Sequence, residues 1–277
     1  MNPKLVVPCT YQGGKQRIAS QIVDELTKNS TEQTRFFDLC CGSGAISVEL
    51  INRGILPSNV VMLDVSSWGA FWEKIGSGSF DIIKFRKLIE SLPIEKKEYK
   101  NYCSWLSSIP VGSDEAELYT ILQANSFGGK QISLIDNHWH NACFRDYWEP
   151  TETSKRRSPA NPMQPSPEEL LRRVELVSTK MKGIQCIHNY ISSLFDIEIS
   201  SNDIVYIDPP YKKTTGYAYN FDVMGFITKF KKKYNTPLFV SESVPLCDNS
   251  KKIVLRGPNG GITGVRKNKH EEWLSLF

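Results

Sequence analysis

The sequence predicts an α/β protein with a doubly wound, mostly parallel sheet into which a second module is inserted. Two observations predict the sheet. Short apolar strand-like runs alternate with amphipathic helical patterns near both ends of the chain, and two of these runs end in an acidic residue at a loop. A third observation predicts the insert, because this alternation stops at residue 68 and returns after residue 180. We therefore expect one domain formed by 1–67 and 181–277, and a second formed by 68–180.

The composition is that of a globular protein. Of the 277 residues, 40% are hydrophobic and 23% charged, and no apolar stretch approaches the ~20 residues that span a bilayer. The first nine residues lack the layout of an export signal, so we expect a cytoplasmic location. Seven cysteines without a Cys-x-x-Cys pair predict reduced thiols. The net charge of +4 permits nucleic-acid binding without requiring it.

The first element is a glycine turn, Tyr11-Gln12-Gly13-Gly14-Lys15. Apolar residues at spacing four follow it and predict a helix: Ile18, Ile22 and Leu26. A turn that leads into a helix N-terminus can hold an anion on its backbone N–H groups, and Lys15 would add a positive charge there. The same sequence also fits an ordinary loop.

The second element is a strand, a glycine loop and a helix. The run 36–41 predicts a buried strand that leads into Gly42-Ser43-Gly44 and then a helix over 45–51. Glycines let a backbone approach a nucleoside-like ligand closely. A second strand over 59–63 ends in Asp64, 20 residues beyond Gly44, the usual distance for a carboxylate that binds ribose hydroxyls. A third glycine is missing, so this Rossmann-like unit fits a nucleoside cofactor better than a dinucleotide.

The insert is rich in aromatic residues. We expect in it a helix over 115–123 and a hairpin that pairs 131–135 with 139–144 around a turn at Asp136-Asn137. A loop dense in proline and basic residues follows, and basic side chains beside such a hairpin suit DNA phosphates and base edges. A helical subdomain with a solvated charge run explains the same composition. The candidate DNA-binding residues are Lys130, Asn137, His138, Arg145, Lys155, Arg156 and Arg157.

No metal site is expected. His138 and His140 flank Trp139, but no carboxylate or cysteine stands at a spacing that would complete a ligand set.

The returning sheet carries the most informative motif. After a helix over 168–180 and a strand over 183–189, the apolar run 204–207 predicts a buried strand that ends in Asp208-Pro209-Pro210-Tyr211. The prolines stop the strand, so the Asp208 carboxylate and the Pro209 carbonyl become free acceptors at the carboxyl edge of the sheet.

Such a set of groups suits an aromatic amine. Two acceptors that bind the hydrogens of a purine amino group localise its lone pair, and Tyr211 can stack on the base. The alternative is a strand-ending turn with a chance Pro-Pro. Beyond it we expect a strand over 236–243 and a closing hairpin with a strand over 252–256 and a turn at Gly260-Gly261.

In this motif order, and over nearly its whole length, the chain resembles the Dam-like (D12 class) adenine-specific DNA methyltransferases. The resemblance implies a methyltransferase sheet with an inserted, mostly helical target-recognition domain that contains the hairpin. It also implies S-adenosylmethionine as cofactor, duplex DNA as partner, and methyl transfer to the 6-amino group of a flipped adenine. Carried over residue by residue, the cofactor-binding positions are Tyr11, Gly13, Gly14, Lys15, Asp38, Cys40, Gly42, Ser43, Gly44, Asp64, Asn189 and Asp208, and the catalytic positions are Asp208, Pro209, Pro210 and Tyr211.

The chain departs from the family pattern at three positions. Cys40 replaces an aromatic residue, Asn189 stands where relatives often have an acid, and Glu242 follows Ser241 where an Asn is frequent. Asp208 argues for adenine, because cytosine-modifying relatives more often carry Ser there and glutamine-modifying ones Asn.

Three other readings stay open: transfer to the cytosine 4-amino group or a glutamine amide, transfer to adenine in RNA, and a catalytically inactive DNA-binding relative. The sequence also leaves open the recognised DNA site and the oligomeric state. It does not decide between a solitary or phage methylase and a restriction-modification partner of a cognate restriction endonuclease.

Overall fold

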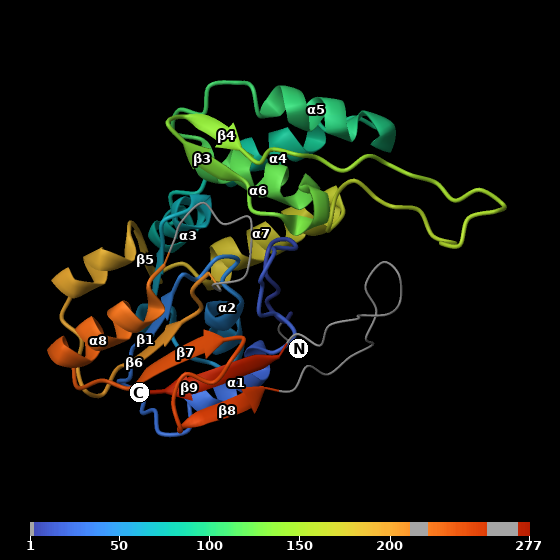
Figure 1. Ribbon diagram of the computed structural model, residues 1–277. Helices are drawn as coiled ribbons and strands as arrows, with labels where there is room; N and C mark the ends of the chain where they lie inside the picture. Colours follow the sequence, from blue (N-terminus) through green and yellow to red (C-terminus); the bar gives the residue numbers. More distant parts are fainter. Residues whose placement is uncertain (1–2, 211–220, 254–270) are drawn as a thin grey trace.

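A seven-stranded sheet forms the centre of the computed structural model, which describes residues 3–210, 221–253 and 271–277 (Figure 1). The strand order is β5-β2-β1-β6-β7-β9-β8. The first five strands pair in parallel, and β9 runs antiparallel to both β7 and β8. The strands are β1 Phe36–Leu39, β2 Val60–Asp64, β5 Gln185–His188, β6 Ile204–Ile207, β7 Leu238–Glu242, β8 Ser250–Ile253 and β9 Glu272–Leu276. The predicted α/β sheet is confirmed, and it is consistent with a methyltransferase fold.

Two hydrophobic cores cover the two faces of the sheet. Strand residues alternate between faces, so Phe36, Met62 and Tyr206 belong to one core, whereas Phe37 and Ile207 belong to the other. The helices that pack on the first face are α1 Ala19–Leu26, α2 Ala45–Asn52 and α3 Ser67–Ser77, and those on the second are α8 Val223–Lys233 and the 3-10 helix η4 Ile191–Asp196. By the same alternation Asp38 lies on the α1 face.

The chain changes direction across the sheet between β1 and β6. From β1 it proceeds outward through β2 to β5, and from β6 it proceeds the other way to β7. Doubly wound sheets bind ligands at the carboxyl edge of such a switch point. The backbone N–H of Asp208, which follows β6, donates to the carbonyl of Leu39 at the end of β1 (3.2 Å). The predicted glycine loop and the Asp-Pro-Pro motif therefore start side by side.

The remaining helices and the small β3–β4 pair gather at one end of the molecule (Figure 1). Their bounds are α4 Ile82–Glu90, α5 Tyr99–Leu106, α6 Glu115–Asn125, α7 Pro167–Lys180, β3 Ser133–Ile135 and β4 His138–His140, with 3-10 turns η2 Lys96–Glu98 and η3 Phe127–Gly129. A further 3-10 turn, η1 Pro57–Asn59, directly precedes β2. The division into two domains stays a prediction. All but the first residue of α3 lies inside 68–180, yet this helix packs on the sheet, since a Cβ on Gly69 would come within 2.2 Å of the Asp64 carbonyl oxygen.

Two elements are shorter than expected for a conformational reason. The first strand ends at Leu39 because Cys40 has a positive φ of 55°, which a strand cannot contain. In the insert only 133–135 pairs with 138–140, around Asp136 and Asn137 with φ values of 49° and 60°. Both positive angles suit a tight hairpin turn.

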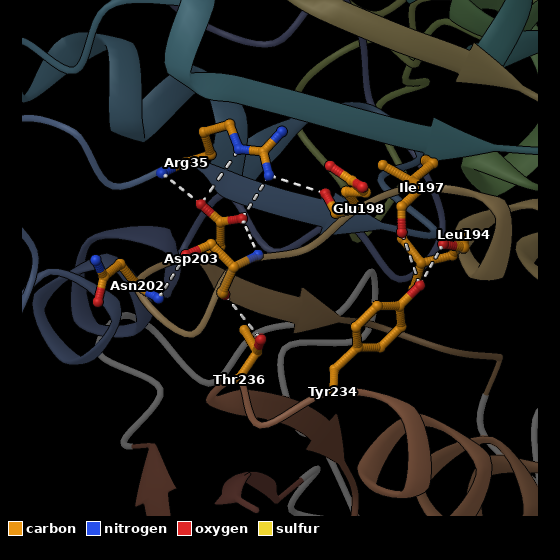
Figure 2. A network of polar contacts seen from close by, with 9 residues as sticks. Arg35, Leu194, Ile197, Glu198, Asn202, Asp203, Tyr234 and Thr236 are labelled. Carbon is orange, nitrogen blue, oxygen red and sulfur yellow. Dashed lines mark hydrogen bonds and ion pairs between the residues drawn. The ribbon is translucent and has the colours of Figure 1, made fainter.

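An ion pair joins β1 and β6 at their amino ends, opposite the switch point (Figure 2). Asp203 Oδ1 accepts from the backbone N–H and Nε of Arg35 (3.3 and 3.2 Å), and its Oδ2 accepts from Arg35 Nη2 (2.6 Å). The hydrogen bond to Asp203 is the main reason that the pKa of Arg35 is raised. Nearby, the Tyr234 hydroxyl donates to the carbonyls of Leu194 and Ile197 (3.2 and 2.8 Å) and fixes η4 to α8.

Within the described ranges, none of the helices has both the length and the apolar character needed to cross a membrane.

Candidate active site

Aromatic side chains pack directly on the glycine loop after β1. A Cβ on Gly42 would lie 2.8 Å from Tyr11 Cε1, and one on Gly44 would lie 2.4 Å from Trp72 Cζ2. Trp72 also donates from Nε1 to the Gly42 carbonyl (2.9 Å). The sequence analysis assigned these glycines to the approach of a ligand. In the structure they also make room for Tyr11 and Trp72, which fix the shape of the loop.

The Asp64 carboxylate at the end of β2 holds the same loop. Its Oδ2 accepts from the backbone N–H of Gly42 (2.8 Å), and its Oδ1 accepts from the backbone N–H and hydroxyl of Ser66 (2.8 and 2.6 Å). Asp64 is buried. A carboxylate offers about four acceptor positions. Asp64 therefore has about one acceptor position left, which can receive a hydrogen bond such as that of a ribose hydroxyl while the carboxylate keeps the loop in place.

Asp38, the acidic residue of β1, bonds to the first turn of α2. Its Oδ2 accepts from the backbone N–H and hydroxyl of Ser47 (3.2 and 2.7 Å). Burial raises the pKa of Asp38 to about 7, with smaller increases from the charges of Asp208 and Asp64, and the Ser47 hydrogen bonds oppose the shift. These contacts fix α2 to β1, so Asp38 supports the glycine loop that connects the two elements.

Lys15 and Asp208 form an ion pair at the switch point. Lys15 Nζ lies 2.8 Å from Asp208 Oδ1 and 3.8 Å from Glu272 Oε1, and it donates to the Gly13 carbonyl (3.2 Å). Lys15 is buried, and the Asp208 side chain is 19% exposed. The Gly-Gly-Lys turn is therefore joined to the Asp-Pro-Pro motif through side chains, although about 190 residues separate them in sequence.

Cys40 lies among three carboxylates. Burial raises the pKa of the Cys40 thiol well above its ordinary value, and the charges of Asp64, Asp208 and Asp38 raise it further. The thiol is thus neutral at physiological pH. Carboxylates gathered around a small neutral group favour a cationic ligand.

The other predicted site residues lie at the same edge of the sheet or outside the described residues. Pro209 is buried and Pro210 half-buried, directly after β6. Asn189 follows His188, whose strand partner is Asp64, but it is exposed and its Oδ1 accepts from the Tyr190 backbone N–H (2.7 Å). Ser43 is buried beside the Gly-Gly turn, where a Cβ on Gly14 would lie 3.5 Å from its hydroxyl.

Some predicted positions fall outside the described residues: Tyr211, the end of the 252–256 strand beyond Ile253, and the turn at Gly260-Gly261.

The predicted DNA-binding residues lie in two places on the surface. Asn137 and His138 are exposed in the β3–β4 turn, and exposed Lys130 precedes it. A loop projects far from the body of the molecule (Figure 1), and an antiparallel bridge between Trp148 and Ala160 closes its base. This loop carries the exposed basic run Lys155, Arg156 and Arg157, and partly buried Arg145 precedes it.

Two of these basic residues interact electrostatically. The pKa of Arg145 is lowered by burial and, to a smaller degree, by the charge of Arg156. Arg156 lies 6.0 Å above the ring of Trp148, so part of its side chain is held against the base of the projecting loop.

A row of aromatic contacts joins the glycine turn to the β3–β4 pair. Tyr11 meets Trp68 edge-on (5.8 Å between ring centroids), Trp68 meets Tyr119 edge-on (5.2 Å), and Tyr119 stacks on Trp139 of β4 (6.1 Å). Edge-to-face and offset contacts at these distances are favourable. The candidate site and the candidate DNA-reading hairpin therefore share one packed core.

The sequence analysis missed three residues of the site: Ser66, Trp72 and Glu272. Ser66 is of a residue type favoured at helix N-caps, and its hydroxyl accepts from the Trp68 N–H at the start of α3 (3.3 Å). No local signal marks Trp72 or Glu272, because each reaches the site only through pairing or packing of distant segments.

The described part of the chain contains no group of three or more His, Cys, Asp or Glu side chains that could hold a metal ion.

The mixed α/β fold with its mostly parallel sheet is consistent with a methyltransferase, and a family comparison supports the same class. Residues 11–102 match the family model of the D12 class N6 adenine-specific DNA methyltransferases. The match spans about a third of the chain and includes the Gly-Gly-Lys turn, the glycine loop and Asp64. The resemblance to this family is thereby confirmed over that span. No curated protein matches the chain.

Proposed function

We propose that this protein is an S-adenosylmethionine-dependent DNA methyltransferase that acts on the 6-amino group of a flipped adenine in duplex DNA. The observation that carries the proposal is the position of Asp208. Its carboxylate lies at the switch point of the sheet, next to the glycine loop that Asp64 holds, and it pairs with Lys15 of the matched N-terminal segment. An acceptor for an amine thus stands beside a site for a nucleoside cofactor.

The residues at this edge fit S-adenosylmethionine. When bound, this cofactor supplies an electrophilic methyl group on a positively charged sulfur. The carboxylates around Cys40 suit that charge. The backbone of Gly42-Ser43-Gly44 and the side chain of Asp64 would hold the nucleoside part. The other predicted cofactor contacts, which surround these, are Tyr11, Gly13, Gly14, Lys15, Asp38 and Asn189.

Asp208 would act by orienting the amine. Its carboxylate and the Pro209 carbonyl accept the two hydrogens of the adenine amino group, and so direct the nitrogen lone pair at the methyl group. Asp208 need not remove a proton beforehand, because the methylated amine is far more acidic than the neutral one. Flipping the base costs a few kcal/mol, which stacking on Tyr211 and hydrogen bonds in the pocket offset.

The insert over 68–180 would bind the DNA. The exposed residues Lys155, Arg156 and Arg157 of the projecting loop suit phosphates, as do Arg145, which precedes this loop, and Lys130, which precedes the β3–β4 turn. Asn137 and His138 at the β3–β4 turn are exposed and can read base edges. The row of aromatic contacts from Trp139 to Tyr11 would hold this turn in a fixed position relative to the cofactor loop.

Transfer of tritiated methyl groups tests the substrate. The cofactor is offered with unmethylated duplex DNA, RNA and protein in parallel, and we expect label in DNA alone. Label in RNA or protein would assign the site to another amine, and label in none would favour a DNA-binding protein without turnover. Long-read sequencing of DNA from a methylation-deficient host that expresses the chain then identifies the modified base and its sequence context.

Substitution of Asp208 tests the chemical role. We expect Asp208→Ala to abolish methyl transfer, because the amine loses its acceptor, while cofactor binding measured by calorimetry stays largely intact. The matched control is Asp248→Ala, which removes an exposed carboxylate from the loop before β8. Appreciable methyl transfer by Asp208→Ala, or an equal loss in the control, would contradict the assignment.

A further inference from the structure

A second carboxylate, that of Glu272, faces the ion pair at the site. Glu272 is the first residue of β9, and its side chain is only 10% exposed. Its Oε1 lies 3.8 Å from Lys15 Nζ, which in turn lies 2.8 Å from Asp208 Oδ1. Both carboxylates are thus within about one Debye length of each other, roughly 8 Å at physiological salt, and are little screened in this partly buried setting.

The topology explains why Glu272 reaches Asp208. Strand β9 pairs with β7, which pairs with β6, the strand that Asp208 follows. Leu274 packs in the core on the α1 face, so Glu272, two residues earlier, points to that face as well. Lys15 comes from the turn that leads into α1 and therefore approaches from the same side.

Tyr206 lies close to both carboxylates. Its ring is buried two residues before Asp208, and its hydroxyl hydrogen-bonds with Ser241 Oγ of β7 (2.8 Å). Burial raises the pKa of Tyr206 well above its ordinary value, the charges of Asp208 and Glu272 raise it further, and the Ser241 hydrogen bond opposes them. Among the described residues, Lys15, Asp208 and Glu272 thus lie together on this face, with Asp38 and Asp64 further along the edge.

Glu272 places a second carboxylate beside the Lys15–Asp208 ion pair. A buried arrangement of this kind is a poor source of stability, because removing charges from water costs about as much as their attraction returns. It is, however, well suited to a reaction in which positive charge arrives. In the proposed reaction a C–N bond forms as the C–S bond breaks. Positive charge passes from sulfur to the amine nitrogen, which then loses a proton to solvent.

We propose that Glu272 is a positioning residue for this reaction. It shares Lys15 with Asp208, so that Lys15 orients the Asp208 carboxylate while Glu272 adds a further negative charge beside it. Loss of the Glu272 charge would weaken the preference of the site for a cation. This inference rests on the proposed function and adds to it a residue that strengthens the negative charge of the site.

The first test compares two ligands that differ in charge. Calorimetry gives the affinities for S-adenosylmethionine, which carries the sulfonium, and S-adenosylhomocysteine, which is the neutral thioether. In Glu272→Gln we expect the preference for the cation to fall by roughly five- to tenfold, because one negative charge is lost close to the site. Both ligands bind only the folded chain, so partial unfolding lowers the two affinities alike and leaves their ratio unchanged.

The matched control is the neighbouring acidic residue. Glu271→Gln removes the same charge one position earlier, where the side chain is 43% exposed and pairs with Lys252. We expect its ratio of affinities to equal that of the wild-type chain. Glu272→Asp keeps the charge, and we expect it to keep the ratio within about twofold. A ratio that is unchanged in Glu272→Gln, or that falls equally in Glu271→Gln or Glu272→Asp, would overturn the proposal.

The second test separates chemistry from binding. In steady-state methyl transfer to DNA we expect Glu272→Gln to lower kcat roughly tenfold or more, with KM for DNA within about twofold of wild type, because the lost interaction is with the charge that develops during transfer. A kcat equal to wild type would refute the role of Glu272. Failure of the wild-type chain to bind S-adenosylmethionine or to methylate DNA would instead refute the proposed function.

Discussion

Replacement of Gly44 by Ala separates the two reasons for a glycine in the loop after β1. Gly44 has a φ of +74°, and an added Cβ would meet Trp72 Cζ2 at 2.4 Å, Trp72 Cε2 at 2.7 Å and Met62 Cε at 3.1 Å. Trp72 is fully buried, and its Nε1 is already bonded to the Gly42 carbonyl, so its ring has little room to move. The substitution therefore adds a steric clash to the backbone strain.

The magnitude follows from these two terms. A left-handed backbone costs a residue with a Cβ about 1–2 kcal/mol, and overpacking a core site costs about 1–3 kcal/mol more. We expect Gly44→Ala to lower the free energy of unfolding by about 2–5 kcal/mol. Gly54 is the matched control, because its φ is +88° but nothing lies within 4 Å of an added Cβ. Gly54→Ala should cost only the backbone term, about 1–2 kcal/mol.

Urea unfolding followed by circular dichroism measures both variants against the wild-type chain. Calorimetry with S-adenosylmethionine then shows whether the loop that Trp72 supports still binds the cofactor, and we expect weaker binding for Gly44→Ala alone. Equal destabilisation of the two variants would refute the reasoning, because it would mean that the Trp72 ring moves away from the new methyl group with no loss of stability.

Two further predictions concern charged groups. Asp203→Asn should lower the free energy of unfolding, measured by urea titration, by about 1–3 kcal/mol. This loss is smaller than for a fully buried pair, because the Arg35 side chain is 37% exposed. Methyl transfer per folded molecule should not change, and a loss of activity without a loss of stability would contradict this. For Asp38, burial raises the pKa from 3.8 to about 7, so between these pH values the folded state holds a proton that the unfolded state has released, and stability falls as pH rises. The stability of Asp38→Asn relative to wild type, measured by urea unfolding at pH 4.5 and 8, should therefore increase with pH, and an unchanged difference would exclude the raised pKa.

Local patterns predicted the parts of the fold that local chemistry determines. The strand over 204–207 has the predicted bounds, because an apolar β-branched run stands between polar residues and two prolines. The glycine loop and Asp64 were predicted together for the same reason, and the structure joins them by the Gly42–Asp64 hydrogen bond. Which ligand these residues bind stays a prediction.

Contacts between distant segments could not be predicted in this way. Lys15 was assigned to cofactor binding from a turn of five residues, and the structure pairs it with Asp208 from the other half of the chain. Glu272 gave no signal, because it begins β9 and the order of strands in the sheet alone decides which residues lie beside it. Trp72 had been counted with the aromatic insert, although it packs against the loop after β1.

The Arg35–Asp203 pair has a consequence for how this protein could be altered. It fixes β1 and β6 to each other at their amino ends, and the four residues of β6 separate it from Asp208 by roughly 16 Å at about 3.3 Å per residue. An ion pair is neutral as a whole, so at that distance its exchange for an uncharged pair changes the electric field at Asp208 very little. Substitutions at the amino edge of the sheet can therefore raise thermal stability without changing the chemistry at the carboxyl edge.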